Sequence, residues 1–184
     1  MKTRLSTYNN DWYQPGRSSI VRLLWLLASA LFVQCSWNPL SSVRVVLLRL
    51  FGAQIGKGVV IKPGVQVKYP WYLSVGDFSW IGEHVWIDNL TQVTIGTDVC
   101  LSQGAYLLTG NHDYKKSTFD LMVQPIVLED GVWIGAKAIV CPGVICRTHA
   151  VVTAGSVARN ELQPYSINSG NPAVFVKERA FQTT

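Results

Sequence analysis

Aliphatic residues recur at every sixth position through most of the chain. The first positions of these hexapeptides are, in order, Ile55, Ile61, Val67, Val75, Ile81, Ile87, Ile95, Leu101, Leu107, Leu128, Ile134, Val140, Cys146 and Val152. Thirteen of these fourteen positions hold Ile, Leu or Val, so chance is a poor explanation of the period. A fixed short period is typical of a solenoid, in which stacked repeats bury one continuous core. Three hexapeptides would close one triangular coil, and coils would stack at roughly the 4.8 Å spacing of a β ladder.

The pattern therefore predicts an all-β solenoid of about five coils over residues 53–160. The first coils start twenty residues apart, and we assign the two extra residues of each to positions 73–74 and 93–94. Trp71 is the one misfit at the fifth place of a hexapeptide, which should also point inward. The fifth places of the other early hexapeptides are held by Val59, Val65, Ser79, Val85, Thr91, Val99 and Ala105.

The period breaks once, between Leu107 and Leu128. A loop excursion is expected at about residues 109–126, and it contains the sequence Thr-Gly-Asn-His-Asp around His112. Excursions from a rigid scaffold are common places for function. This loop is therefore the first place to look for chemistry.

Residues 1–52 precede the repeat and form a separate segment. Residues 1–19 are polar and are expected to extend along another surface. Residues 20–37 are mostly apolar, but this run is shorter than the roughly 20 apolar residues of a membrane-spanning helix. A second helix is predicted over residues 43–51, with Ser41 or Ser42 as its N-cap and Gly52 at its end.

Residues 20–51 allow two interpretations. Arg22, Arg44 and Arg49 flank apolar faces, as in a helix that lies on a membrane surface. The alternative is a helical cap over the open end of the solenoid, which any stack of repeats must protect. One segment can serve both roles. The last segment, residues 161–184, is predicted to be a tail that follows the solenoid.

The composition and the charge of the chain limit the classes of molecule that it is expected to bind. The chain is 48% hydrophobic and 15% charged, which indicates a globular protein. The net charge of +5 arises entirely in residues 1–51, and the neutral repeat region argues against nucleic acid as a partner. Four cysteines without metal-ligand spacing, and no secretory signal, favour a cytoplasmic protein, with peripheral contact at the inner face of the membrane as a further option.

Several motifs together resemble a known family. The segment VWIGAKAIVCPGV, the TGNHD break and the closing SGNPA resemble the left-handed β-helix acetyltransferases of the maltose, galactoside and serine type. The stretches LLRLFGAQIGKG, QGAYLLTGNHDY and PIVLEDGVWIG resemble more narrowly the WcaF-type acetyltransferases of colanic acid and exopolysaccharide synthesis. The left-handed sense of the coils is implied by this resemblance.

The resemblance implies an activity. It implies an acetyl-CoA-dependent O-acetyltransferase that acts on a saccharide, without a metal or an acyl-enzyme, as a homotrimer with active sites between subunits. The acceptor would be a lipid-linked or nucleotide-linked intermediate of a surface polysaccharide. His112 matches the catalytic histidine of the family, and an imidazole suits a general base near neutral pH. Asp113 is a candidate to orient it or to bind substrate.

Further site residues follow from the same resemblance. Glu83, His84, Asp88 and Asn89 match the region that lines the acceptor pocket. Residues implied to bind acetyl-CoA are Trp133 beside the pantetheine arm, Ala136 and Ala154 through their backbones, and Arg159, Asn171, Lys177 and Arg179 near the phosphates and nucleotide. The Cys146–His149 stretch departs from the family, which usually has Ile-Gly and then a small residue there.

Three alternatives stay open. The acceptor can instead be a small free sugar, an amino sugar or a xenobiotic. A zinc lyase like the γ-carbonic anhydrases shares this solenoid and uses three histidines, but His84, His112 and His149 are 28 and 37 residues apart and show no paired spacing. A solenoid that binds without catalysis is the third alternative.

Overall fold

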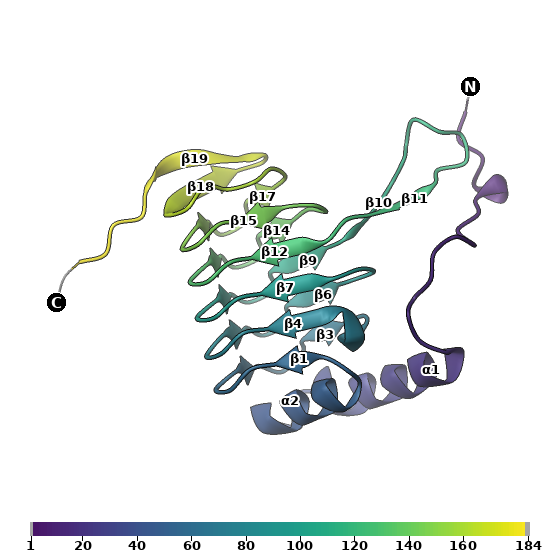
Figure 1. The fold of residues 1–184 in the computed structure, drawn as a ribbon, viewed down its shortest axis with the longest axis horizontal. Helices are drawn as coiled ribbons and strands as arrows, with labels where there is room; N and C mark the ends of the chain where they lie inside the picture. The colour runs from purple at the N-terminus through teal and green to yellow at the C-terminus, as the bar shows by residue number, and fades with distance from the viewer. Residues whose placement is uncertain (1, 183–184) are drawn as a thin grey trace.

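Three walls of short parallel strands enclose the core of the computed structural model, which describes residues 2–182 (Figure 1). Face A consists of β1 (Gln54–Ile55), β4 (Leu73–Val75), β7 (Val93–Ile95), β12 (Ile126–Leu128) and β15 (Ile145–Cys146). Face B consists of β2 (Val60–Ile61), β5 (Trp80–Ile81), β8 (Cys100–Leu101), β13 (Trp133–Ile134), β16 (Val151–Val152), β18 (Ser166–Gly170) and the antiparallel β19 (Ala173–Glu178). Face C consists of β3 (Gln66–Val67), β6 (Trp86–Asp88), β9 (Tyr106–Leu108), β14 (Ile139–Val140) and β17 (Val157–Ala158). The corners between these faces are called the AB, BC and CA corners.

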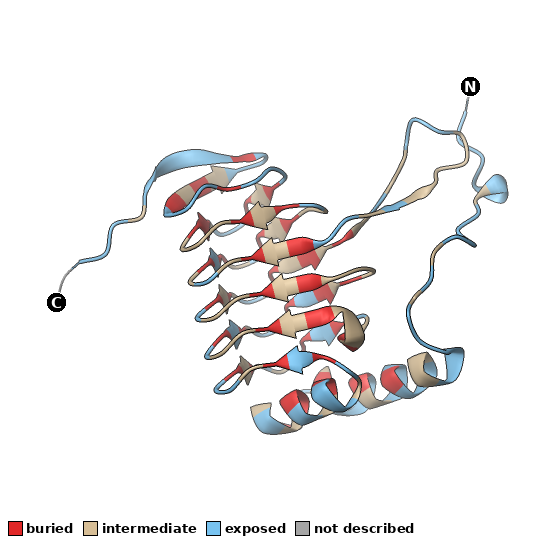
Figure 2. Ribbon diagram, viewed as in Figure 1, coloured by how far each residue is buried: buried red, intermediate tan, exposed pale blue. Residues whose placement is uncertain are grey.

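The core forms from the predicted aliphatic positions. All fourteen are buried, and the most exposed of them, Ile55, is only 8% exposed. Aligned registers place each inward residue over its equivalent in the next coil, as in Ile134 over Leu101 and under Val152. Figure 2 shows the resulting buried positions repeated up the walls. The period predicted from sequence is therefore confirmed as the period of the core.

The extra residues of the first coils do not lie where we placed them. Leu73 and Val93 are themselves buried, at 1% and 0% exposure, because each stands two residues before an inward residue of the same strand. The extra residues precede them, and in the first coil they form the 3₁₀ turn η3 (Pro70–Tyr72). Trp71 is a misfit for this reason: it belongs to the turn and not to the wall.

The solenoid is also longer than predicted. Five complete coils are followed by a partial sixth, which begins where Leu162 bridges to Cys146 and continues as β18 beside β16. β19 then folds back antiparallel on β18. The residues after 160 thus add a further partial coil.

Helices cover the first coil. The 3₁₀ turn η1 (Leu5–Thr7) lies in the N-terminal segment, and α1 (Ser19–Ala28), the π-helical turn η2 (Ser29–Val33) and α2 (Ser41–Leu50) form the base. Trp25, Val33 and Leu48 are buried against the first coil. The Trp25 indole N–H also donates to the carbonyl of Val67 over 3.0 Å. The structure therefore supports the cap interpretation, and no helix within residues 2–182 is long and apolar enough to cross a membrane.

Two details of the predicted helices are wrong. The N-cap of α2 is Leu40, and the Ser41 hydroxyl instead accepts a hydrogen bond from the Ile61 N–H over 2.8 Å, which ties the helix to β2. Arg44 does not flank a surface: it is fully buried, and burial lowers its pKa. Its guanidinium donates to the carbonyls of Val33, Cys35, Asn38 and Leu40.

The break in the period forms a hairpin. β10 (Gly110–His112) and β11 (Leu121–Val123) pair antiparallel and project from the CA corner. The N-terminal segment runs alongside, as predicted for residues 1–19, with the Arg4 N–H donating to Ser117 over 2.8 Å and the Tyr13 hydroxyl to Leu90 over 2.6 Å. Segments more than a hundred residues apart in sequence thus lie together here.

Candidate active site

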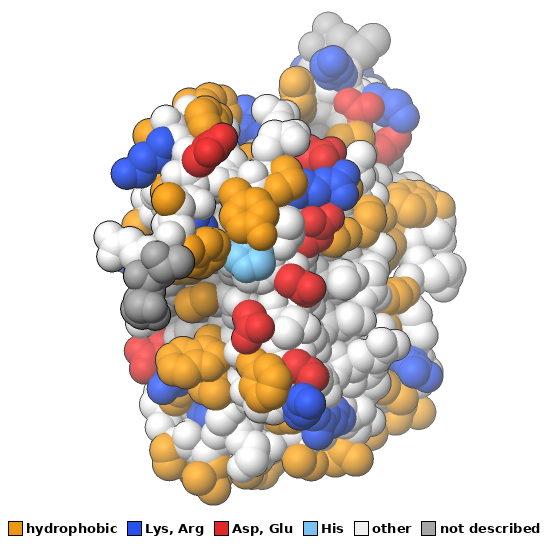
Figure 3. Space-filling model, turned by 60° about the vertical axis from the view of Figure 1, so that its left-hand side comes forward, with side chains coloured by type: hydrophobic (Ala, Val, Ile, Leu, Met, Phe, Trp, Pro, Cys, Tyr) orange, Lys and Arg blue, Asp and Glu red, His pale blue; other side chains and the backbone are white. Residues whose placement is uncertain are grey.

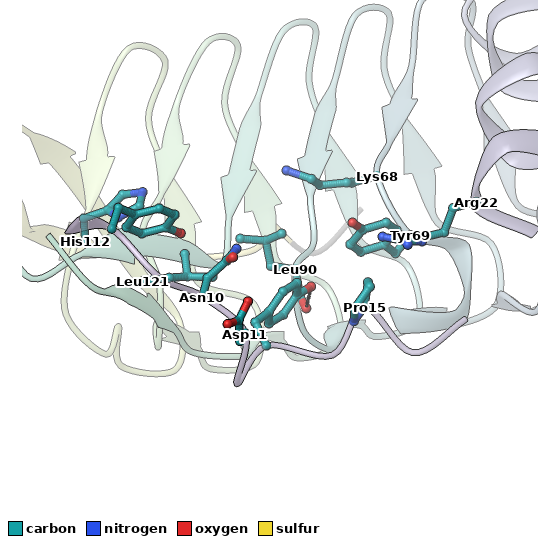
Figure 4. A pocket seen from close by; sticks show the side chains of 11 residues that line it. Asn10, Asp11, Pro15, Arg22, Lys68, Tyr69, Leu90, His112 and Leu121 are labelled. Carbon is teal, nitrogen blue, oxygen red and sulfur yellow. Dashed lines mark hydrogen bonds between the residues drawn. The ribbon is translucent and has the colours of Figure 1, made fainter. Parts of the chain in front are cut away.

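A cavity of about 610 Å³ lies between the N-terminal segment, the hairpin and the CA corners of the first two coils, and we call it the hairpin cavity (Figure 4). His112 and Leu121 of the hairpin line its upper end, and Arg22 of α1 lines its lower end. Aromatic, basic and acidic side chains share the lining, so the cavity is polar rather than an extension of the core. The lining residues are Tyr8, Asn10, Asp11, Tyr13, Pro15, Arg22, Lys68, Tyr69, Leu90, His112 and Leu121.

His112 is held in a defined orientation at the upper end of the hairpin cavity. Its Nδ1 lies 2.8 Å from the carbonyl oxygen of Phe119, and its ring stacks on the Phe119 ring at 4.4 Å and 6°. Tyr8 packs on it at 5.7 Å. A carbonyl oxygen can only accept, so Nδ1 carries the hydrogen and Nε2 keeps its lone pair. An imidazole in this tautomer is equipped to act as a base at Nε2.

Asp113 does not orient the imidazole. Its Oδ1 accepts a hydrogen bond from the backbone N–H of Lys115 over 3.1 Å, within the hairpin turn. The orienting role that we had assigned to a carboxylate falls to the Phe119 carbonyl. No sequence pattern predicts this contact, because it depends on the conformation of the hairpin tip, where Phe119 adopts a left-handed φ of 54°.

Two cations lie at the opposite end of the cavity from His112 (Figure 4). Lys68 Nζ lies 2.9 Å from Asp88 Oδ1, an ion pair without the alignment of a hydrogen bond. The guanidinium of Arg22 donates to Ser19, but its Nε is buried without a partner. Burial also raises the pKa of the nearby Tyr13 hydroxyl, with Tyr69 and the Asp88 charge adding to the shift. This end of the cavity is therefore suited to an anionic group.

The predicted acceptor residues separate in the structure. Glu83 and His84 are exposed at the BC corner, whereas His112 projects from the CA corner. Asn89 is fully buried, with both ends of its amide bonded to the backbone of Tyr69 over 2.7 and 3.0 Å. Only Asp88 lies beside the hairpin cavity. Within one chain, the four residues do not form one pocket.

Comparison with known proteins identifies the family. No family model matches the chain. The chain is 39% identical over 169 residues to the putative colanic acid biosynthesis acetyltransferase WcaF of Escherichia coli (strain K12), and the alignment covers 91% of each protein. This chain belongs to the WcaF-type hexapeptide-repeat acetyltransferases. It is therefore an acyltransferase, as the sequence predicted.

Solved structures agree on the fold of this WcaF-type acetyltransferase. A hexapeptide-repeat acetyltransferase of Vibrio cholerae in complex with acetyl-coenzyme A aligns with a TM-score of 0.79 and 24% identity, over 90% of this chain and 92% of that one. Galactoside acetyltransferase in complex with coenzyme A aligns with a TM-score of 0.76 and 21% identity, over 88% and 82%. The predicted fold class, the hexapeptide-repeat left-handed β-helix, is confirmed.

Three of the predicted cofactor residues form a strip in this WcaF-type acetyltransferase. Trp133 stands on face B with 47% of its surface exposed, and its indole N–H donates to the Ser102 hydroxyl over 2.9 Å. Ala136 and Ala154 follow at the BC corner, where they occupy equivalent positions in successive coils, and the Gly155 N–H donates to Ala136 over 2.9 Å. A flat exposed indole beside small residues leaves room for an extended ligand.

The other predicted cofactor residues occupy two further places. Arg159 and Asn171 border a cavity of about 430 Å³ with Asn111, on the side of the hairpin away from His112. Lys177 is exposed on β19. The guanidinium of Arg179 donates to the carbonyls of Gly131 and His149 over 2.9 and 3.2 Å, so it is tied to the AB corner. The structure therefore brings together two of these four residues.

The irregular Cys146–His149 stretch leaves the wall intact. Cys146 is fully buried in the face A column, and burial raises the pKa of its thiol to about 12. Arg147 forms ion pairs with Glu129 at 2.9 Å and Glu161 at 2.7 Å. His149 stacks on Tyr165 at 4.9 Å. These contacts replace those of the usual family residues and preserve the register.

The three histidines lie at three different corners of the triangle. His84 follows β5 at the BC corner, His149 follows β15 at the AB corner, and His112 projects from the CA corner. Within residues 2–182 no three His, Cys, Asp or Glu side chains are grouped so that they could hold a metal ion. The histidine set of a zinc lyase is therefore not assembled within one chain.

The N-terminal segment contributes residues to the site that were not predicted from the sequence. Tyr8, Asn10, Asp11 and Tyr13 line the hairpin cavity although they lie about a hundred residues before His112. The segment has no repeat, so no periodicity could place it. Its one signal is the density of aromatic and polar side chains in a stretch that otherwise reads as a flexible terminus.

Proposed function

We propose that this enzyme transfers the acetyl group of acetyl-CoA to a saccharide hydroxyl during synthesis of a surface polysaccharide, with His112 as the general base. The observation that carries the proposal is the tautomer of His112. Its Nδ1–H is engaged by the Phe119 carbonyl, and its Nε2 is free at the upper end of a polar cavity. The name of the WcaF relative supports the pathway.

The chemistry needs one base and no enzyme nucleophile. The acceptor hydroxyl oxygen attacks the thioester carbonyl carbon while Nε2 of His112 accepts its proton. When the C–S bond breaks, the imidazolium returns that proton to the departing thiolate. A cysteine nucleophile is poorly supported, because burial raises the pKa of Cys100, Cys141 and Cys146 and disfavours the reactive thiolate.

The donor is expected on the strip of Trp133, Ala136 and Ala154. Two structural neighbours were solved with acetyl-coenzyme A or coenzyme A bound. In this chain the exposed indole and the two alanines offer an apolar track, and the exposed cations Arg159 and Lys177 suit the phosphates. Arg179, whose guanidinium is already bonded to two carbonyls, contributes through the shape of the AB corner.

This placement of the donor favours a homotrimer. Trp133 lies on face B, whereas His112 projects from the CA corner between faces C and A, so one chain does not present both to the same substrate. A neighbouring subunit that set its face B against the hairpin would complete the site. The same arrangement would also return Glu83 and His84 of one subunit to the region of His112 in another.

The acceptor is expected in the hairpin cavity. Tyr8, Tyr13 and Tyr69 offer aromatic faces for a sugar ring, and Arg22 and Lys68 stand at the far end, where a phosphate of a lipid-linked or nucleotide-linked saccharide would lie. The unpartnered Nε of Arg22 supports this assignment, since a buried cationic donor is costly without an acceptor.

The test measures release of the coenzyme A thiol from acetyl-CoA with a panel of acceptors. The panel contains free sugars, nucleotide-linked sugars and lipid-linked saccharides. We expect the linked saccharides to be preferred, and His112→Ala to lower kcat/KM by about 10²- to 10⁴-fold, the usual contribution of a general base. A preference for free sugars would contradict the proposed acceptor class.

Asp113→Asn is the matched control. Its carboxylate bonds the turn and not the imidazole, so we expect its kcat/KM to stay close to that of the unmodified enzyme. If His112→Ala were as active as Asp113→Asn, the proposed base would be wrong.

A further inference from the structure

The outer side of the helical base is apolar, and we call this surface the apolar base. On α1 and η2, Ile20, Leu24, Leu27 and Leu31 recur at helical spacing on the side opposite the buried Trp25. All four are at least 53% exposed. The exposed large hydrophobic side chains of residues 20–50 are Ile20, Leu23, Leu24, Leu26, Leu27, Leu31, Phe32, Trp37, Leu40, Val46 and Leu50.

The apolar base is continuous across its helices. A groove of about 330 Å³ between η2 and α2 is lined by Phe32, Val43, Val46 and Leu47, with Ser42 as its only hydroxyl residue. Phe32 also packs on Trp37 at 5.8 Å. In Figure 3 hydrophobic side chains follow the lower edge of the molecule, where the helices lie in Figure 1. A continuous surface of this extent is unusual on a protein that has no partner for it.

The sequence that forms this end of the molecule carries charge of mainly one sign. No Asp or Glu occurs between Asp11 and Asp77, whereas the same stretch contains seven Lys and Arg residues. Lys57, Lys62 and Lys68 follow the three strands of the first coil, so one lysine stands near each corner directly above the base. Lys57 and Lys68 are paired with Asp77 and Asp88 of the second coil, whereas Lys62 forms no ion pair within residues 2–182, so the surroundings of the apolar base carry an excess of positive charge.

We propose that the apolar base binds the surface of an anionic phospholipid bilayer. Aliphatic side chains enter the boundary between headgroups and acyl chains, while surrounding lysines are attracted to anionic headgroups. The excess of positive charge disfavours a second copy of this chain as the occupant, because two ends with the same net charge would face each other. The docking does not depend on the proposed function.

The orientation has a consequence that does rest on the proposed function. A second cavity, lined by Arg22, Lys68 and Tyr69 together with Trp25 and Leu26, connects the lower end of the hairpin cavity to α1. A protein docked through the apolar base would hold this opening near the headgroups. A saccharide carried by a membrane lipid would then reach His112 from below.

The test is flotation of the full-length protein with vesicles, without acceptor or acetyl-CoA. We expect co-flotation with vesicles that contain phosphatidylglycerol, at least about tenfold weaker binding to pure phosphatidylcholine, and weakening by salt. Equal binding to both lipids, or binding to neither, would overturn the proposal. Because no substrate is present, failure here leaves the acetyltransferase assay unaffected.

Two pairs of variants locate the surface. Leu23→Gln with Leu27→Gln should reduce vesicle binding about tenfold or more, whereas Leu5→Gln, equally exposed but on the N-terminal segment, should not. Lys62→Glu should weaken binding about fivefold, and Lys137→Glu, after the equivalent strand region of a higher coil, should have little effect. All five side chains are exposed, so thermal unfolding should be nearly unchanged.

One result would point to a protein partner instead. If the Leu23 and Leu27 variant kept its vesicle binding and changed only the oligomeric state in solution, the apolar base would be a contact between copies of this chain, and the lipid proposal would be wrong.

Discussion

The CA corner differs from the other two corners of the solenoid in its freedom of length. At the AB and BC corners every step between successive inward residues is six residues long. At the CA corner the steps have four different lengths, which are 8, 8, 21, 6 and 4 residues in chain order. They run from Val67 to Val75, Ile87 to Ile95, Leu107 to Leu128, Val140 to Cys146 and Ala158 to Leu162. All variation in coil length therefore occurs at the CA corner.

The difference shows how this fold separates stability from chemistry. The strands of face A stay in register although the CA steps that lead to them vary, because the extra residues leave the wall as turns or as the hairpin. The CA corner is connected by polar contacts, such as Asn89 to the Tyr69 backbone and the Gln124 N–H to the Thr109 carbonyl over 2.9 Å. Because it is not fixed by the period, this corner can project the hairpin and form the hairpin cavity.

The largest effect is expected when the hairpin at the CA corner is replaced by a shorter connection. Residues 108–127 would be replaced by a copy of residues 88–94, which gives the third coil the corner of the second. We expect the solenoid to fold and acetyl transfer to fall by at least about 10²-fold, since His112, the proposed base, is removed with the hairpin. Circular dichroism and the thiol-release assay check the two parts.

The matched control for this exchange is His112→Ala in the intact hairpin. Both variants should lose activity to a similar extent and keep the solenoid spectrum. If the exchange unfolded the protein while His112→Ala did not, the hairpin would be part of the framework and the separation proposed above would fail.

A substitution in the wall should give the opposite pattern. Leu107 is fully buried in the face C column, and Leu107→Ala should reduce the free energy of unfolding by about 2–5 kcal/mol through lost burial and the cavity left behind. Leu24→Ala, at an exposed leucine, should change it by less than about 0.5 kcal/mol. Urea unfolding measures both, and a cost for Leu107→Ala no larger than that for Leu24→Ala would contradict the assignment of the core.

The wall could be predicted from the sequence because burial and period coincide there. Each inward residue meets the same environment one coil above and below, so its side chain repeats, as at Ile81, Leu101 and Ile134. The period places the next inward residue six positions after Val67, at residue 73, so the two extra residues were predicted at positions 73–74. Leu73 is fixed by its distance to Val75, which follows it in the same strand.

The site could be predicted only where the period failed. His112 was predicted because it lies where the repeat stops and because it matches the catalytic histidine of the family, but its partner Phe119 and its neighbour Tyr8 lie in segments without a period. Arg44 was misplaced for a related reason. A guanidinium on an apolar helix suggests that the residue lies at the surface. In the structure the Arg44 guanidinium lies in the interior, where it donates hydrogen bonds to four backbone carbonyls.

A smaller change at the variable corner tests how His112 is held. Phe119→Ala keeps the carbonyl that accepts from Nδ1 but removes the stacked ring, so Phe119 is a positioning residue. We expect kcat to fall about tenfold with little change in the KM for acetyl-CoA, because a looser imidazole lies less often in reach of the hydroxyl. Phe119→Tyr should restore kcat, and a loss confined to KM would contradict this role.

The smallest expected effect concerns Cys146, a titratable residue that is buried in the face A column. Burial raises the pKa of Cys146 from 9.0 to about 12, so between these values the unfolded chain loses a proton that the folded chain keeps. Stability is therefore complete below pH 9 and falls as the pH rises towards 12, by up to about 1.4 kcal/mol per pH unit. Between pH 8 and pH 10 the unmodified protein should lose about 1.4 kcal/mol more than Cys146→Ala in urea unfolding. Groups shared by both proteins cancel in this difference, and parallel pH profiles would show that Cys146 is not sealed in the core.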